Sequence, residues 1–189
     1  MAAIAALIKL TSSGPAIYKQ ERVGVDRRQS RPAGNFRRSR DIGGRPFTIY
    51  KFRTMRQNGD ADGDAQVWAS PDDPRVTGVG RVLRRYRLDE LPQLFNVLRG
   101  DMNVVGPRPE QPEIFASLKS EVEQYHVRQQ VLPGITGWAQ INHHYDTSVD
   151  SVRRKVAYDL EYVGRRSAAE DLKIMAKTFP VMLLRKGAW

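Results

Sequence analysis

The sequence predicts an α+β fold in which helices dominate, formed by one domain over residues 1–189. The chain is long enough to bury a single core, and its hydrophobic content of 40% is typical of a folded protein. Several segments repeat apolar residues at helical spacing, whereas two short segments are rich in β-branched and aromatic residues. These observations favour many helices around a small β element.

The first predicted helix covers residues 1–11 and ends at Ser12-Ser13-Gly14-Pro15. Its apolar run is much shorter than the roughly 20 residues that span a bilayer. This run is either a buried first helix or part of a longer hydrophobic segment. Further helices are predicted where apolar residues recur at helical spacing. These segments are residues 77–87, 89–99, 112–131, 147–164 and 168–185.

Two segments are predicted strands, residues 16–23 and 47–55, and the second is rich in β-branched and aromatic side chains. Residues 26–46 and 57–75 are polar and are predicted to be loops. Residues 131–142 combine a proline, two glycines and mixed apolar residues, which predicts a structured loop that packs against the core rather than a helix.

The composition excludes some classes of site and indicates an anionic partner. The chain has no cysteine, which excludes disulfides and thiolate metal sites. Its net charge is +10, and residues 22–56 carry eleven Lys or Arg against two acids, a net charge of +9. Such a block favours phospholipid, nucleic acid or a phosphorylated substrate, with a solvated basic loop as the simpler alternative.

The acidic pair Asp89-Glu90 lies among arginines, and Pro92 follows two positions later. Proline is tolerated in the first turn of a helix, so both acids are predicted at a helix N-terminus. The helix dipole and the neighbouring arginines would keep both carboxylates ionised. An ionised Asp89 in this position either caps the helix or attacks an electrophile.

The basic residues near this pair suit chemistry on a phosphate. A carboxylate that attacks a phosphate needs a divalent cation or arginines to neutralise the phosphoryl oxygens. Glu90 is a candidate ligand for Mg²⁺, which binds one or two carboxylates together with substrate phosphates. Arg84 lies five residues before Asp89, and Arg108 lies in the stiff turn Gly106-Pro107-Arg108-Pro109, where a fixed guanidinium suits bidentate phosphate binding.

Several long blocks in order resemble the bacterial sugar transferases, the monotopic polyprenyl-phosphate phosphoglycosyl transferases. The blocks are IKLTSSGPAIYKQERVG (8–24), FTIYKFRTM (47–55), DPRVTGVGRVLRRYRLDELPQLFNVLRGDMNVVGPRPE (73–110), LPGITGWAQIN (132–142) and YDLEYV (158–163). The resemblance implies transfer of a sugar-1-phosphate from a UDP-sugar to undecaprenyl phosphate, through a phosphosugar intermediate on the enzyme. It further implies a role in starting exopolysaccharide, capsule or O-antigen synthesis.

The resemblance also assigns roles to individual residues. Asp89 would be the nucleophile, Glu90 the Mg²⁺ ligand, and Lys51, Arg84 and Arg108 the groups that bind the substrate phosphates. The enzyme would work on the cytoplasmic face of the bacterial inner membrane. Its basic block and amphipathic helices would lie against anionic lipids. We expect no nucleic-acid partner, and a homodimer is a possible assembly.

The chain departs from the family pattern in two places. The family's N-terminal segment is usually a longer re-entrant membrane helix, and Met1 falls where its second half would be, so residues 1–11 are predicted to be a partial membrane-associated helix. His143-His144 replaces a Gly-Arg pair found in many relatives in a loop linked to donor binding. We expect both histidines to be at the surface.

Three further alternatives stay open at the level of sequence. Trp138 is expected to pack in the core, with stacking on a uracil ring as the alternative, and Gln140 is a candidate donor contact without a firm role. The C-terminal segment 171–189 is either an interfacial helix or a packed one. A catalytically silent membrane-surface scaffold and a basic nucleic-acid-binding module are the competing functions.

Overall fold

The structure, a computed structural model, describes residues 1–27, 43–56, 73–143 and 149–183. Most of the two predicted loops, part of the basic block, His144 and the last six residues lie outside these ranges. The helix-dominated α+β class is confirmed. Nine helical elements of the described residues surround two small sheets; they are α1 (Ala2–Thr11), α2 (Gly78–Arg85), η1 (Leu88–Glu90), α3 (Gln93–Leu98), α4 (Pro112–Glu121), η2 (Tyr125–Gln130), α5 (Trp138–Asn142), α6 (Val149–Arg165) and α7 (Ala168–Leu183).

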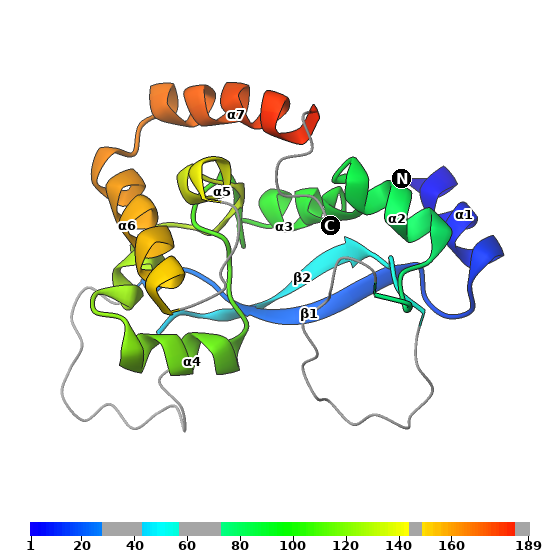
Figure 1. Ribbon diagram of the computed structural model, residues 1–189, viewed down its shortest axis with the longest axis horizontal. Coiled ribbons are helices and arrows are strands. Elements are labelled where there is room, and N and C mark those ends of the chain that lie inside the picture. The colour runs from blue at the N-terminus through cyan, green and yellow to red at the C-terminus, as the bar shows by residue number, and fades with distance from the viewer. Residues whose placement is uncertain (28–42, 57–72, 144–148, 184–189) are drawn as a thin grey trace.

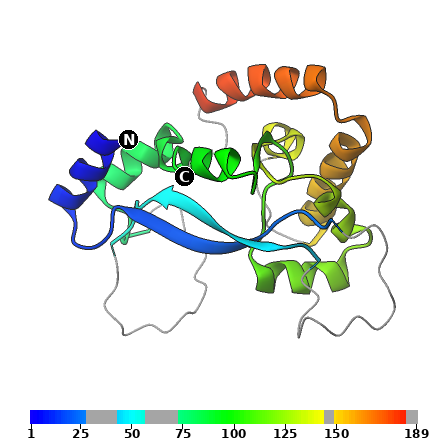
Figure 2. The ribbon, with the colours of Figure 1, turned by 180° about the vertical axis from the view of Figure 1, so that it is seen from behind.

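The longer sheet is an antiparallel ribbon of β1 (Ile17–Val23) and β2 (Pro46–Phe52), close to the two predicted strands. In its register Tyr18 is the partner of Lys51. Helices α1, α2, α3 and α7 lie on one side of this ribbon, and α4 lies on the other (Figures 1 and 2). The ribbon therefore divides the molecule, and one of its faces is covered by helices that are far apart in sequence.

The second sheet is short and parallel, and it pairs β3 (Asn103–Val105) with β4 (Gly134–Thr136). Its two strands are followed by Gly106 and Gly137, and a side chain at Gly134 would collide with the backbone of Gly106. Glycine allows this close approach because it has no Cβ. The sheet thereby joins the turn that carries Arg108 to the segment that leads into α5.

The core consists of three clusters of buried apolar side chains. Ile8 of α1, Phe52 of β2 and Leu83 of α2 form one cluster. A second cluster lies between β1, α4, η2 and α6 and contains Phe115 and Tyr125, whose rings are tilted by 50° with their centres 5.2 Å apart. A third includes Ile174 of α7. Because each cluster joins elements distant in sequence, burial of apolar surface holds the helices against the two sheets.

Three predicted elements differ from the structure. Residues 131–142 were expected to contain no helix, but α5 begins at Trp138, after the glycines of β4 and its flank. The predicted helix 89–99 is split into η1 and α3, because Pro92 caps α3 instead of lying inside it. The predicted helix 112–131 breaks before Tyr125, where Gln124 adopts a left-handed conformation with φ 58°.

The two terminal helices match their predicted spans within the described residues. No helix in the described ranges is both long enough and apolar enough to cross a bilayer. Helix α7 packs through Ile174, which is fully buried, while Leu172 and Phe179 on the same helix are 66% and 69% exposed. The helix therefore has a packed side and an exposed apolar side, and the interfacial alternative stays a prediction.

Candidate active site

The acidic pair lies in the short turn η1, between the end of α2 and the start of α3. Arg87 precedes the turn in the left-handed backbone conformation, with φ 56°, which residues other than glycine rarely adopt. This reversal turns the chain sharply between α2 and η1. Pro92, with φ −61°, then caps the start of α3. Local backbone chemistry thus places Asp89 and Glu90 side by side in the middle of the molecule.

Glu90 is held by two cations that come from different elements. Its Oε1 accepts a hydrogen bond from Lys51 Nζ of β2 at 3.1 Å, and both terminal nitrogens of Arg108 lie 3.3 Å from the same oxygen. The Glu90 side chain is 9% exposed. Burial alone would raise the pKa of Glu90, but the charges of Lys51 and Arg108 outweigh it and hold that pKa at about 2. Glu90 is therefore ionised at neutral pH.

Asp89 lies in a different environment from its neighbour. Among the described residues, its buried Oδ1 has no hydrogen-bond partner. Burial and the adjacent charge of Glu90 raise the pKa of Asp89, and the charges of Lys51 and Arg87 oppose this shift only in part. The sequence argument counted the neighbouring arginines but not the loss of solvent, and the ionisation expected for Asp89 stays a prediction. A carboxylate that is shielded from solvent and accepts no hydrogen bond is more basic, and a better nucleophile, than a carboxylate that caps a helix.

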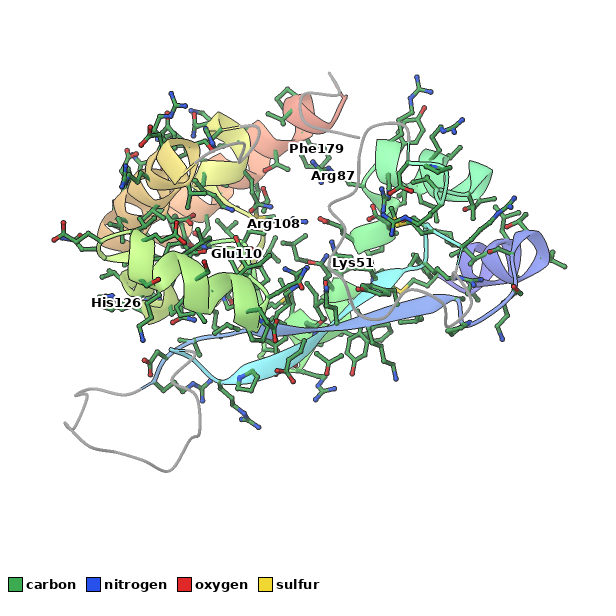
Figure 3. All side chains as sticks on the ribbon, turned by 60° about the horizontal axis from the view of Figure 1, so that its bottom comes forward. Lys51, Arg87, Arg108, Glu110, His126 and Phe179 are labelled. Carbon is green, nitrogen blue, oxygen red and sulfur yellow. The ribbon has the colours of Figure 1, made fainter. Side chains whose placement is uncertain are left out.

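The predicted phosphate-binding residues are only partly brought together. Lys51 and Arg108 both contact Glu90, and Figure 3 shows them converging with Arg87 toward the centre of the molecule. Arg84 instead donates from Nε to Thr54 Oγ1 at 2.9 Å. It acts on the pair through its charge, which lowers the pKa of Asp89. Two of the three cations therefore bind the pair directly, and the third acts on it from α2.

A buried ionic network supports the turn that carries Arg108. Arg128 lies 2.7 Å from the carboxylate of Asp159 and donates to the carbonyl oxygen of Arg108 at 2.9 Å. Glu110 accepts from Lys155 at 2.8 Å and lies 3.5 Å from Arg128. The charges of Lys155 and Arg128 overcome burial and hold the pKa of Glu110 at about 2. The network fixes both ends of the turn between β3 and α4.

The sequence argument assigned no role to this network. Glu110 and Asp159 both lie in blocks of the family resemblance, so their position was a usable signal. No comparable signal marked Arg128, because a charge pair between η2 and α6 leaves no periodic pattern in the sequence.

Trp138 is partly buried against the cluster of Val105, Tyr162 and Ile174. Its indole nitrogen donates to Glu161 at 2.7 Å, and the guanidinium of Arg165 lies 4.3 Å from the ring centre. These contacts support the packing interpretation over stacking on a base. Gln140 donates to the carbonyl oxygen of Ile135 at 3.0 Å. His143 is only partly exposed, at the end of α5.

The acidic pair suits a hard cation that takes most of its ligands from a substrate. Within the described ranges, no group of three or more His, Asp or Glu side chains is placed to hold a metal ion. Both cations that bind Glu90 contact Oε1, which makes Oε2 the candidate metal ligand. Mg²⁺ commonly binds one or two carboxylates and completes its shell with phosphate oxygens and water. The residues present therefore fit Mg²⁺ bound together with a diphosphate.

A carboxylate with a raised pKa beside an ionised one, with cations around both, suits chemistry on a phosphate. The chain belongs to the bacterial sugar transferase family, whose model matches residues 1–185. It is 44% identical over 188 residues to the UDP-N-acetylgalactosamine-undecaprenyl-phosphate N-acetylgalactosaminephosphotransferase of Aeromonas hydrophila. The match covers 100% of this chain and 40% of that relative.

Two further relatives match nearly the whole of this chain at slightly lower identity. The UDP-glucose:undecaprenyl-phosphate glucose-1-phosphate transferase of Escherichia coli K12 is 39% identical over 98% of this chain and 36% of its own length. The uncharacterized sugar transferase EpsL of Bacillus subtilis is 38% identical, over 96% of this chain and 77% of its own length. The chain therefore spans well under half of the first two relatives and most of the third.

Proposed function

We propose that the protein transfers a sugar-1-phosphate from a UDP-sugar to undecaprenyl phosphate, as the names of its relatives state for those proteins. The observation that carries the proposal is the unequal environment of the two acids. Oε1 of Glu90 is bound by Lys51 and Arg108, whereas the buried Oδ1 of Asp89 has no hydrogen bond from the described residues. One acid is thus suited to bind a cation and the other to attack.

The reaction takes place in two displacements at one phosphorus atom. A carboxylate oxygen of Asp89 attacks the phosphorus that carries the sugar, and the bond to the bridging oxygen of the diphosphate breaks. UMP leaves with that oxygen, and the sugar phosphate stays on Asp89 as an acyl phosphate. An oxygen of undecaprenyl phosphate then attacks the same phosphorus, which restores the carboxylate and forms a polyprenyl diphosphate sugar.

Cations around the pair lower the barrier to both displacements. Lys51, Arg84 and Arg108 neutralise the phosphoryl oxygens, which otherwise repel an anionic nucleophile. Glu90 would hold Mg²⁺ through Oε2, and the metal would supply Lewis-acid charge to the diphosphate. Because Glu90 stays ionised, it keeps this role across the physiological pH range.

The same proposal places the protein on the cytoplasmic face of the bacterial inner membrane. Its support is the side of the molecule formed by α1, α2, α3 and α7, which carries large exposed apolar side chains. Those side chains are Leu7, Leu10, Val82, Tyr86, Leu94, Phe95, Leu98, Leu172, Met175 and Phe179. Such a surface suits contact with lipid, and the net charge of +10 favours anionic headgroups. The lipid-linked product would begin a polysaccharide repeat unit.

The test is release of UMP from a panel of UDP-sugars, with undecaprenyl phosphate and Mg²⁺ in detergent. We expect Asp89→Asn to abolish release while the protein stays folded, and Asp101→Asn, at the end of α3, to serve as the matched control. Lipid-linked sugar formed by Asp89→Asn would remove Asp89 as the nucleophile. Absence of product from every donor with the wild type would favour the silent scaffold, and salt-sensitive retention on DNA would favour a nucleic-acid-binding module.

A further inference from the structure

A cleft of about 260 Å³ is lined by Glu90, but not by Lys51 or Arg108. Its walls come from α3, the second sheet, α5 and α7. The residues that line it are Arg85, Arg87, Glu90, Leu91, Leu94, Val104, Ile135, Thr136, Gln140, Ile141, Thr178 and Val181. Of the acidic pair, Glu90 lines the cleft, and the remaining lining differs from that of the ionic contacts around it.

The polar side chains in the walls are only partly satisfied, because the buried Oε1 of Gln140 has no hydrogen-bond partner among the described residues. Thr136 and Thr178 share a hydrogen bond of 2.8 Å between their hydroxyls, and Thr178 also donates to the carbonyl oxygen of Ile174. Gln140 donates to the carbonyl oxygen of Ile135. Six of the lining side chains are aliphatic. Beside them, a ligand with many hydroxyls would lose most of its hydrogen bonds to water without replacement.

Charge is confined to one end of the cleft. Arg85, Arg87 and Glu90 lie there, whereas the remaining lining residues are uncharged. Leu94 and Val104 are 41% and 37% exposed, so the apolar walls reach the molecular surface. Arg85 is also exposed, so the charged end reaches the surface too. A cleft that joins a charged end to aliphatic walls matches an amphiphile with one anionic head.

We propose that this cleft binds the first isoprenoid units of the polyprenyl phosphate acceptor, with its phosphate at the arginine end beside Glu90. This inference rests on the proposed function and assigns the acceptor a site distinct from the donor's. The volume lies just under the range of about 300–1,000 Å³ typical of sites that enclose a whole small ligand. It suits the head of a long chain whose remainder stays in the membrane.

The test compares three exposed positions at which a leucine or valine becomes glutamine. Leu94→Gln and Val104→Gln place an amide on two different walls of the cleft. Leu98→Gln makes the same change on α3 at a side chain that is 83% exposed and outside the cleft. This third variant controls for any general loss of contact with detergent or lipid.

Steady-state rates are measured against undecaprenyl phosphate, and the UMP burst is measured without acceptor. We expect the two cleft variants to raise the KM for the acceptor roughly 10-fold, since small changes in an apolar pocket have effects of this size. The UMP burst should keep its rate and amplitude. Geranyl phosphate, which has only two isoprenoid units, should show the same loss if the first units occupy the cleft.

Other outcomes distinguish a failure of the cleft proposal from a failure of the proposed function. Acceptor KM values that agree among wild type, Leu94→Gln, Val104→Gln and Leu98→Gln would overturn the cleft proposal while leaving the transferase intact. A slower UMP burst in the cleft variants would also overturn it, because the cleft would then serve the donor. A wild type that forms no lipid-linked product from any donor would overturn the proposed function itself.

Discussion

The guanidinium of Arg128 donates a hydrogen bond to the carbonyl oxygen of Arg108 at 2.9 Å, and its other contacts fix where that carbonyl lies. The same side chain pairs with Asp159 at 2.7 Å and donates to the hydroxyl of Tyr125 at 2.8 Å. Burial would lower the pKa of Arg128, but the charge of Asp159 outweighs it and raises that pKa above its usual value. A permanently charged group on η2 therefore links α6 to the turn that holds Arg108.

Loss of Asp159 should destabilise the fold more than loss of the whole pair. Asp159→Leu leaves Arg128 as a buried charge without its carboxylate, which typically costs about 3–5 kcal/mol. Replacing both residues, as in Arg128→Met with Asp159→Leu, should recover much of this loss. Urea unfolding of the two single variants and the double variant measures the coupling. Single-variant losses that simply add in the double variant would show that the pair is not a unit.

Arg108→Lys should impair turnover although it keeps the charge. A single ammonium cannot reproduce the two nitrogens that lie 3.3 Å from Glu90, nor a bidentate contact with phosphate. We expect kcat/KM for the UDP-sugar to fall by at least about 10-fold, the effect of losing roughly 1.4 kcal/mol of stabilisation in the transition state. Arg153→Lys, at an exposed pair with Asp150, is the control. Near-normal kcat/KM would mean that Arg108 supplies charge alone.

Glu90→Gln should weaken the response to Mg²⁺. The amide keeps the shape of the side chain but loses the negative charge that binds a cation, and it leaves Lys51 and Arg108 facing a neutral partner. Mutation of a group that only supports a metal ligand lowers metal affinity or activity by about 10–100-fold. Loss of a ligand itself should therefore raise the half-saturating Mg²⁺ concentration at least roughly 10-fold. Glu113→Gln, exposed on α4, controls for net charge. An unchanged Mg²⁺ titration would show that Glu90 is not a ligand.

The stability of the protein should fall in acid through Glu110. Its pKa is about 2 in the folded state against an ordinary 4.5, so the ionised form stabilises the fold above pH 4.5. This contribution, roughly 3 kcal/mol, is lost as the pH falls from 4.5 toward 2. Glu110→Gln should flatten the decline in the free energy of unfolding over this window, and Glu90 would account for the slope that remains. A decline as steep in Glu110→Gln as in Glu113→Gln would contradict this assignment.

Local sequence patterns predicted the helices and strands well where one signal dominates. Apolar spacing located α1, α2, α6 and α7, and β-rich composition located the strands of the ribbon. The errors arose where two signals compete. Pro92 was predicted inside the helix 89–99 but caps α3, and the left-handed Gln124 interrupts the predicted helix 112–131. The glycines of residues 131–142 concealed the short helix that follows them. Backbone reversals at residues other than glycine leave little trace in sequence.

The candidate site could be predicted in identity but not in electrostatics. The resemblance singled out Lys51, and the structure places it against Glu90. The direction of the pKa shift of Asp89 depends on burial, which comes from tertiary packing and not from its neighbours in sequence. The support from Arg128 was missed for the same reason, since η2 and α6 meet only in the folded molecule.

The contacts of the site also bear on the order in which the chain folds. Lys51 and Glu90 are 39 residues apart in sequence, and Lys155 and Glu110 are 45 apart. Closing loops of this length costs chain entropy that only later packing repays, so such contacts form late. A chain still emerging from the ribosome would carry the acidic pair before Lys155 and Asp159 are available to order the turn of Arg108. The protein would gain its reactive centre last, once its α6 helix has docked.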